Sequence, residues 1–142
     1  MKILLAVDGS KSSLAAVRCL IEHVDWYGKV PEVQLVTVHL PVPQLRGMGA
    51  AVGRKQLQDY YRSEGEERLA SAKRLLEGAR IRYTSAVLVG PVAETLVEHA
   101  RKERCDIIYI GTRGMNAIGK ALVGSTASKV MHISTVPVLL VK

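Results

Sequence analysis

The sequence predicts one parallel α/β domain, a Rossmann-like fold with a five-stranded sheet and helices on both faces. Five short runs are almost continuously Val, Ile and Leu, which suits strands buried on both faces of a sheet. Four longer segments between these runs place apolar residues at helical spacing. This alternation along the 142 residues implies parallel strands joined by right-handed crossovers. We therefore expect a single domain over residues 1–142.

The predicted strands are short and aliphatic. We expect them at residues 2–7, 33–40, 83–89, 106–110 and from Val136 to Val141. The chain has one Trp, five Tyr and no Phe, so the core must be built from Val, Leu, Ile and Ala. The last strand is apolar, and at the edge of the sheet it would leave the N–H and C=O groups of residues 138–141 unpaired.

Four helices are expected between the strands. The first follows Ser10, a good N-cap residue, and the second covers 54–79, where Gly65 is a weak point. The third opens at Gly90 and Pro91, and the fourth begins near Gly124. The side chains expected to face the core are Leu14, Val17, Ile21 and Val24; Leu57, Tyr61, Leu69, Ala72 and Leu76; Ala93, Leu96, Val97 and Ala100; and Ala127, Val130 and Met131.

One long irregular stretch interrupts this pattern. It runs from Pro41 to Gly53 and contains two prolines and three glycines, so it is not regular structure throughout. A loop of this length in a compact domain is either a functional flap or simply mobile, and the sequence favours neither.

Charge and cysteine content limit which partners and which cellular compartment we expect. The chain carries 20 Lys and Arg against 13 Asp and Glu, a formal net charge of +7. The basic residues are scattered, without a run of five or six and without interleaved aromatic residues, so we expect solvated helix faces and no nucleic-acid partner. Cys19 and Cys105 lack metal-ligand spacing and suit buried thiols in a reducing compartment. No apolar run is long enough for a signal peptide or a membrane helix, so we expect a cytoplasmic protein.

The segment with the most functional information joins the fourth strand to the fourth helix. It reads Gly111-Thr112-Arg113-Gly114, then nine residues, then Gly124-Ser125-Thr126. Glycines let backbone N–H groups approach phosphate oxygens, and a helix N-terminus adds N–H donors and a positive dipole end. Arg113 and Lys120 could add positive charge. The alternative interpretation is that the glycines serve tight turns alone.

This segment matches neither common phosphate-binding motif. No Gly-Lys-Ser/Thr occurs, and G-x-G-x-x-G is missing after the first strand, which ends Val7-Asp8-Gly9-Ser10. Ligands of parallel sheets sit beyond the carboxyl ends of the strands, where the strand order reverses. If the first and fourth strands are neighbours, Asp8 faces the Gly111 loop and can accept from ribose hydroxyls or help to hold Mg²⁺. Alternatively, Asp8 makes only an Asx turn or a helix cap.

Together these motifs resemble the universal stress protein family, in the right order over essentially the whole chain. The matching elements are Val7-Asp8-Gly-Ser10, Gly90-Pro91-Val-Ala-Glu94, Asp106 to Gly114, Gly124-Ser125 and Val136 to Val141. The resemblance implies a parallel sheet in the strand order 3-2-1-4-5. Gly111, Gly114, Gly124 and Ser125 match the G-x2-G-x9-G-[ST] pattern of the ATP-binding branch of that family.

The resemblance also implies a set of nucleotide-binding residues. Asp8 would lie near ribose and adenine, the backbone of Val38 would meet adenine, and the glycine segment would hold the phosphates. The complete candidate set is Val7, Asp8, Ser10, Val38, Gly111, Arg113, Gly114, Gly124, Ser125 and Thr126. The expected ligand is ATP with Mg²⁺, and family members commonly form homodimers through the last strand.

The sequence does not predict a fast enzyme. We find no catalytic residues, no paired carboxylates near the glycine segment from Gly111 to Thr126 and no set of metal ligands. His39 alone among the histidines falls at the carboxyl end of a strand, and we interpret it as a surface or packing residue more readily than as a ligand contact. We expect an ATP-binding stress-response regulatory protein with slow or no hydrolysis. The alternatives are a nucleotide-transferring or adenylate-forming enzyme on a related fold, or a basic protein associated with nucleic acid.

Overall fold

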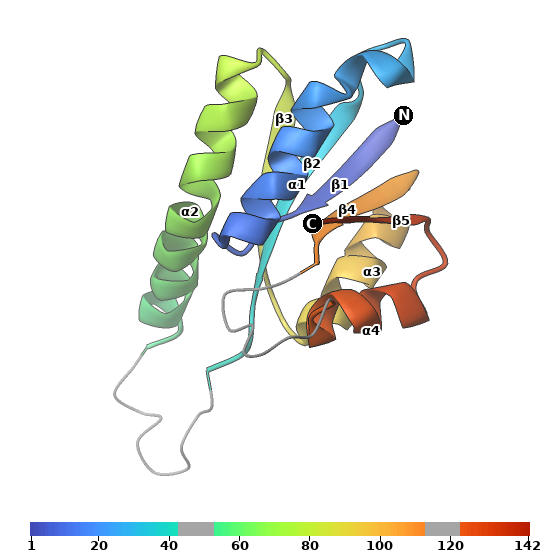
Figure 1. Ribbon diagram of the computed structural model, residues 1–142. Helices are drawn as coiled ribbons and strands as arrows, with labels where there is room; N and C mark the ends of the chain where they lie inside the picture. Colours follow the sequence, from blue (N-terminus) through green and yellow to red (C-terminus); the bar gives the residue numbers. More distant parts are fainter. Residues whose placement is uncertain (43–52, 113–122) are drawn as a thin grey trace.

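The computed structural model describes residues 1–42, 53–112 and 123–142, which form one α/β domain (Figure 1). The predicted order of strands and helices is confirmed, with one 3-10 turn, η1, that was not predicted. The elements are β1 (Lys2–Ala6), α1 (Lys11–Glu22), η1 (Val24–Tyr27), β2 (Glu32–His39), α2 (Arg54–Gly78), β3 (Tyr83–Val89), α3 (Val92–Lys102), β4 (Ile107–Gly111), α4 (Ser125–Ile133) and β5 (Val138–Val141).

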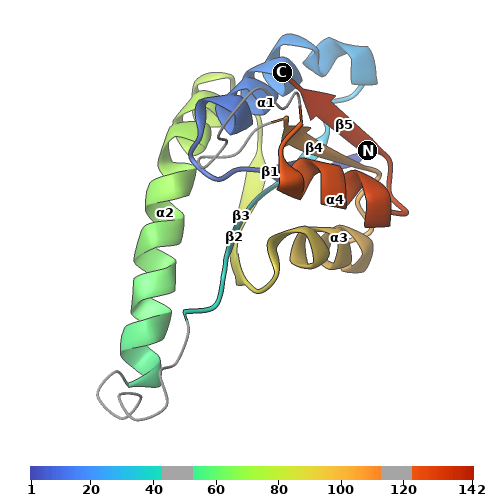
Figure 2. The same cartoon turned by 60° about the horizontal axis from the view of Figure 1, so that its bottom comes forward.

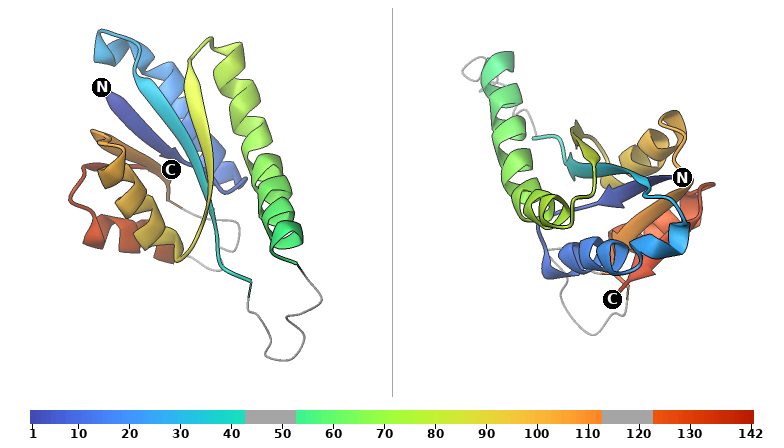
Figure 3. Two further views of the ribbon diagram at one scale, coloured as in Figure 1. Left: turned by 180° about the vertical axis from the view of Figure 1, so that it is seen from behind. Right: turned by 90° about the horizontal axis from the view of Figure 1, so that it is seen from above.

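The five strands form one parallel sheet in the order β3-β2-β1-β4-β5, as expected. Side chains alternate across β1, so Ile3 and Leu5 join a core under α1 and α2, while Leu4 and Ala6 join a second core under α3 and α4. Figure 1 shows α1 in front of the sheet, and the reverse view in Figure 3 brings α3 and α4 forward. Both faces of the central strands are therefore buried by aliphatic residues.

The two edge strands are less buried than the sequence indicated. Thr84, Ser85 and Val89 of β3 are exposed, and every residue of β5 is only half-buried. The expectation that all five apolar runs are buried on both faces is wrong for these two, because an edge strand has a neighbour on one side only. Met131 was expected in the core, but it is 44% exposed.

The pairing of β5 with β4 defines which backbone groups face the open edge. The carbonyls of Pro137 and Val141 accept hydrogen bonds from Ile108 and Thr112, both at 2.8 Å. Because alternate residues of a strand direct their N–H and C=O groups to opposite sides, only Val138 and Leu140 present theirs to the open edge. The expectation that residues 138–141 all leave these groups unpaired is therefore wrong.

A glycine allows helix α2 to pack closely against β3. A Cβ on Gly65 would lie 2.5 Å from both Cγ atoms of Val87, a distance that two carbon atoms do not tolerate. Gly65 was predicted as a weak point of the helix; it is buried and permits the close approach. The first turns of α2 extend beyond the carboxyl ends of β1 and β4 (Figure 2).

Within the described parts of the chain, no helix has the length and apolar character needed to cross a bilayer.

Candidate functional site

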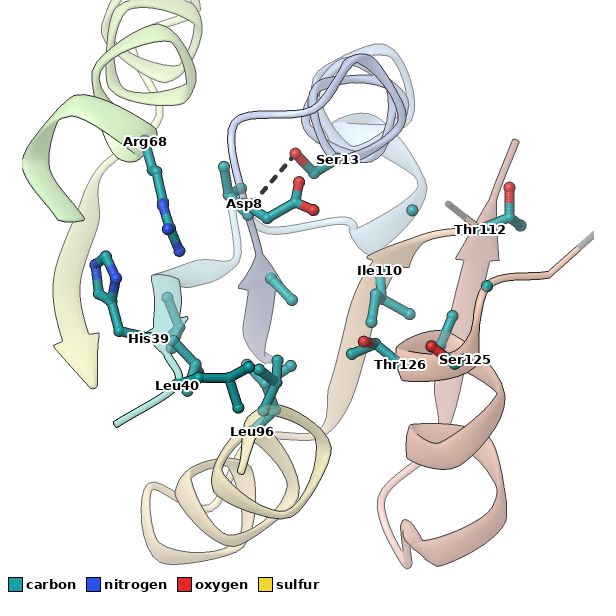
Figure 4. A pocket seen from close by; sticks show the side chains of 18 of the residues that line it. Asp8, Ser13, His39, Leu40, Arg68, Leu96, Ile110, Thr112, Ser125 and Thr126 are labelled. Atoms are coloured by element: carbon teal, nitrogen blue, oxygen red, sulfur yellow. Dashed lines mark hydrogen bonds between the residues drawn. The ribbon is translucent and has the colours of Figure 1, made fainter. Parts of the chain in front are cut away.

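A cavity of about 470 Å³ opens at the carboxyl ends of β1, β2 and β4. The chain goes from β1 to β2 on one side and returns to β4 on the other, so the strand order reverses here. Such a position is where open α/β sheets bind ligands. Figure 4 shows Thr112, Ser125 and Thr126 on one side of the cavity, and His39 and Arg68 on the other.

The α4 side of the cavity is built from a helix N-terminus. Gly124 is the N-cap, and its own N–H donates to Thr112 O at 2.6 Å. Glycine has no side chain with which to cap the first turn, and the first N–H groups of a helix have no partner inside it. Gly124, Ser125 and Thr126 all line the cavity. This side therefore offers N–H donors, two hydroxyls and the positive end of a helix dipole.

Gly111 also lines the cavity, and close packing against α1 requires a glycine at this position. A Cβ there would lie 2.5 Å from the carbonyl carbon and oxygen of Ser12, at the start of α1. The backbone of β4 thus approaches α1 at a distance that other residues do not allow. Close packing accounts for this glycine without any ligand.

Asp8 serves the local turn and also lines the cavity. Its Oδ1 accepts a hydrogen bond from Ser10 N at 2.9 Å, which is an Asx turn. Ser10 in turn accepts from Ser13 N at 3.1 Å and caps α1. Both interpretations of Asp8 are therefore compatible with its geometry. The structure does not bring Ser10 to the cavity wall.

The floor of the cavity is apolar. Two residues of the predicted site, Val38 at the end of β2 and Val7 after β1, line it. They are joined by residues from the sheet face that α3 and α4 cover, from the segment after β2 and from α3: Ala6, Val36, Leu40, Val92, Leu96 and Ile110. A flat apolar group, such as a purine ring, suits such a floor.

The α2 side of the cavity was not predicted. Its wall contains His39, Tyr61 and Arg68, which come from β2 and from two turns of α2. The rings of His39 and Tyr61 have their centroids 5.6 Å apart, and Tyr61 Oη accepts from Val42 N at 2.7 Å. The sequence signal was weak, because only the place of His39 at a strand end pointed to the cavity.

His39 is the most unusual of these side chains. It is 4% exposed, and its Nε2 has no hydrogen-bond partner among the described residues. Burial lowers the pKa of its imidazole below the usual value of 6.5; the charge of Arg68 lowers it further, and Glu64 opposes the shift. The interpretation of His39 as a surface residue is wrong: its imidazole is buried in the cavity wall.

Two predicted site residues, Arg113 and Gly114, lie outside the described residues, as does Lys120. The same holds for residues 43–52 of the irregular stretch.

Fold and site together define the class: a parallel α/β protein with a cavity at the position where the strand order reverses. The chain belongs to the universal stress protein family, whose model matches residues 1–142.

Similar proteins come from archaea and bacteria. The universal stress protein MJ0531 of Methanocaldococcus jannaschii is 29% identical over 142 residues, which cover 99% of this chain and 81% of that protein. A universal stress protein of Thermus aquaticus, encoded in the 3′ region of a QAH/OAS sulfhydrylase, is 31% identical over 140 residues, covering 99% and 97%.

Solved structures share the fold. The hypothetical protein MJ0577 superposes with a TM-score of 0.83 at 27% identity, covering 99% of this chain and 94% of its own. Two more distant neighbours are a universal stress protein in complex with cAMP, at TM-score 0.70 and 23% identity, and an Arabidopsis thaliana family member with AMP bound, at 0.71 and 15%. They cover all of this chain, and 97% and 91% of their own chains. At such identities, these two show the fold alone.

Proposed function

We propose that this protein is a cytoplasmic ATP-binding regulatory protein of the stress response, which holds the nucleotide with Mg²⁺ in the cavity at the carboxyl edge of the sheet. The observation that carries the proposal is the N-terminus of α4, which opens into this cavity at Gly124, Ser125 and Thr126. Uncapped N–H groups at a helix N-terminus bind phosphate through hydrogen bonds and the helix dipole.

The remaining walls suit the rest of the nucleotide. The apolar floor around Val38 would take the adenine, and the carboxylate of Asp8, which lines the same cavity, would accept hydrogen bonds from ribose hydroxyls. Mg²⁺ commonly binds to phosphates and one or two carboxylates, and Asp8 is the one carboxylate among the described residues that line the cavity. Two distant neighbours with the same fold are solved with cAMP and with AMP bound, which supports nucleotide binding as the proposed function.

We expect hydrolysis to be slow or absent. Fast hydrolysis needs a group that orients the attacking water, and no second carboxylate accompanies Asp8 among the described residues of the cavity. His39 lies on the α2 side, across the cavity from the α4 N-terminus (Figure 4). Steady-state turnover should fall below the usual enzyme range, which begins at about 1 s⁻¹.

Calorimetric titration tests the proposal. ATP with Mg²⁺ should bind at one site per chain, and GTP more weakly, because the backbone of β2 near Val38 would contact the adenine, as the family resemblance implies. Absence of heat and of any thermal shift at millimolar ATP would contradict the proposal. Duplex DNA belongs in the same series at two salt concentrations, since tight and strongly salt-dependent DNA binding would favour a nucleic-acid function.

We also propose a homodimer through β5. Val138 and Leu140 present backbone groups at this edge, and a two-fold axis beside the strand would pair it antiparallel with its copy. The other edge strand, β3, is a poorer candidate because it exposes the polar side chains of Thr84 and Ser85.

A pair of proline substitutions tests the dimer. Leu140→Pro removes an N–H donor from the open edge, and it should shift the protein from two-chain to one-chain mass in light scattering. Leu139→Pro removes a donor that faces β4, so it should chiefly lower the thermal stability. A one-chain mass for the unmodified protein at micromolar concentration would refute the dimer.

A further inference from the structure

The α2 wall of the cavity holds a positive charge, on Arg68, that forms no ion pair with the described residues. Arg68 lines the cavity and is half-buried. It takes part in none of the ion pairs or hydrogen bonds found between described residues, although its charge reaches His39. A guanidinium that is partly removed from water without a partner costs free energy, which an anionic ligand group would offset.

Packing fixes the position of Arg68 relative to the ribose side of the cavity. Tyr61, Gly65 and Arg68 lie at helical spacing on one face of α2, and the contact of Gly65 with Val87 sets the rotation of that face. Gly9, the residue after Asp8, packs on the same turn: a Cβ on Gly9 would lie 3.6 Å from Arg68 Cα and 3.8 Å from its Cγ. Arg68 therefore lies beside the turn that carries Asp8 (Figure 4).

We propose that Arg68 and His39 form a second anion subsite, which takes a phosphate attached to the ribose of the bound adenine nucleotide. This inference rests on the proposed function, because it assumes that Asp8 meets the ribose. The preferred ligand class is then an adenosine bisphosphate, with one phosphate at the N-terminus of α4 and the other at Arg68.

The chemistry of the subsite suits a phosphate. Arginine binds phosphate with two parallel hydrogen bonds, and an arginine near a ribose-binding carboxylate is a known way to accommodate a ribose phosphate. His39 Nε2 and the hydroxyl of Tyr61 are further potential donors.

Two carboxylates act against the subsite and limit its strength. Asp8 lines the same cavity, and Glu64, one turn before Arg68, acts electrostatically on His39. A charge-assisted hydrogen bond strengthens binding by about ten- to a hundredfold before such repulsion. We therefore expect the second phosphate to strengthen binding about tenfold, near the low end of that range.

The test compares AMP with adenosine 3′,5′-bisphosphate and adenosine 2′,5′-bisphosphate by calorimetry. In the unmodified protein, one of the two bisphosphates should bind about tenfold more tightly than AMP, and which one does so identifies the ribose position. In Arg68→Gln this ratio should fall to about one, since the stem stays and the charge is lost. Arg62→Gln is the matched control: it removes the same charge from an exposed position of the same helix, so the ratio should persist.

The outcomes separate the two levels of the proposal. If AMP binds but neither bisphosphate is favoured, or if Arg68→Gln keeps the preference, the subsite is refuted and the nucleotide site stands. If no nucleotide binds to the unmodified protein, both are refuted. If Arg68→Gln loses AMP binding as well, the ratio of bisphosphate affinity to AMP affinity is measured in the unmodified protein at two salt concentrations. The ratio should fall as ionic strength rises, and a ratio that does not fall refutes the subsite.

Discussion

The two sides of the cavity offer ligands different chemistry. The α4 side presents main-chain N–H groups and the hydroxyls of Ser125 and Thr126, none of which changes its charge near neutral pH. The α2 side presents the side chains of His39, Tyr61 and Arg68, one of them charged and one titratable. Ligand binding at the α4 side should be weakened by a substitution that adds side-chain bulk. Ligand binding at the α2 side should be weakened by a substitution that removes a charge. The comparison predicts that the two sides respond to different substitutions.

The largest effect is expected on the α4 side. Gly124→Val should weaken ATP binding about a hundredfold or more, because a branched side chain would displace phosphate from two charge-assisted hydrogen bonds of about 1.5–3 kcal/mol each. The fold should persist, since Gly124 has φ −72° and ψ 160°, which valine readily adopts. Gly78→Val is the control, because a Cβ at Gly78 has no atom within 4 Å. Normal ATP binding by Gly124→Val in calorimetry would exclude phosphate from this helix end.

A smaller effect is expected where α2 is attached to the sheet. Gly65→Ala should lower the free energy of unfolding by about 1–3 kcal/mol through overpacking against Val87. The higher helix propensity of alanine should offset about 1 kcal/mol of this loss. Gly78→Ala makes the same change without the contact, so it should leave stability equal or slightly higher. In a denaturation series, Val87→Ala should recover part of the loss when combined with Gly65→Ala. Additive effects of the two substitutions would show that this contact does not position α2.

The smallest effect concerns pH, and it belongs to the α2 side alone. Because the pKa of His39 is lower in the folded chain than its usual 6.5, the unfolded chain binds more protons as pH falls. The free energy of unfolding should therefore decrease as pH falls through the ordinary histidine range. The pKa of His99 is lowered too, chiefly by burial, so it adds to the same slope. Urea denaturation at several pH values should show a shallower slope for His39→Gln, and an unchanged slope would argue against a neutral, buried His39.

The sequence predicted the α4 side of the cavity because its signal is local. One strand, one glycine-containing segment and one helix start follow each other directly, and Asp8 follows β1 in the same way. The strand order came from the family resemblance and is confirmed. The positions of Arg113 and Gly114 stay a prediction.

The α2 side could not be predicted because its residues meet only through packing. His39, Tyr61 and Arg68 come together because Gly65 lets α2 approach Val87, and helical periodicity alone does not reveal that contact. The edge strands show the same limit. Apolar content indicated that β3 and β5 are strands, but their burial depends on how many neighbours the sheet gives them.

The central claim is that phosphate binds at the N-terminus of α4. Amide resonances of ¹⁵N-labelled protein, followed by NMR during titration with ATP and Mg²⁺, test it most directly. The account predicts the largest shifts at the backbone amides of Ser125 and Thr126, with a second group near Val38 at the end of β2. Shifts concentrated at the opposite end of the sheet, around Trp26 or His99, or saturation without any change at Ser125 and Thr126, would contradict it.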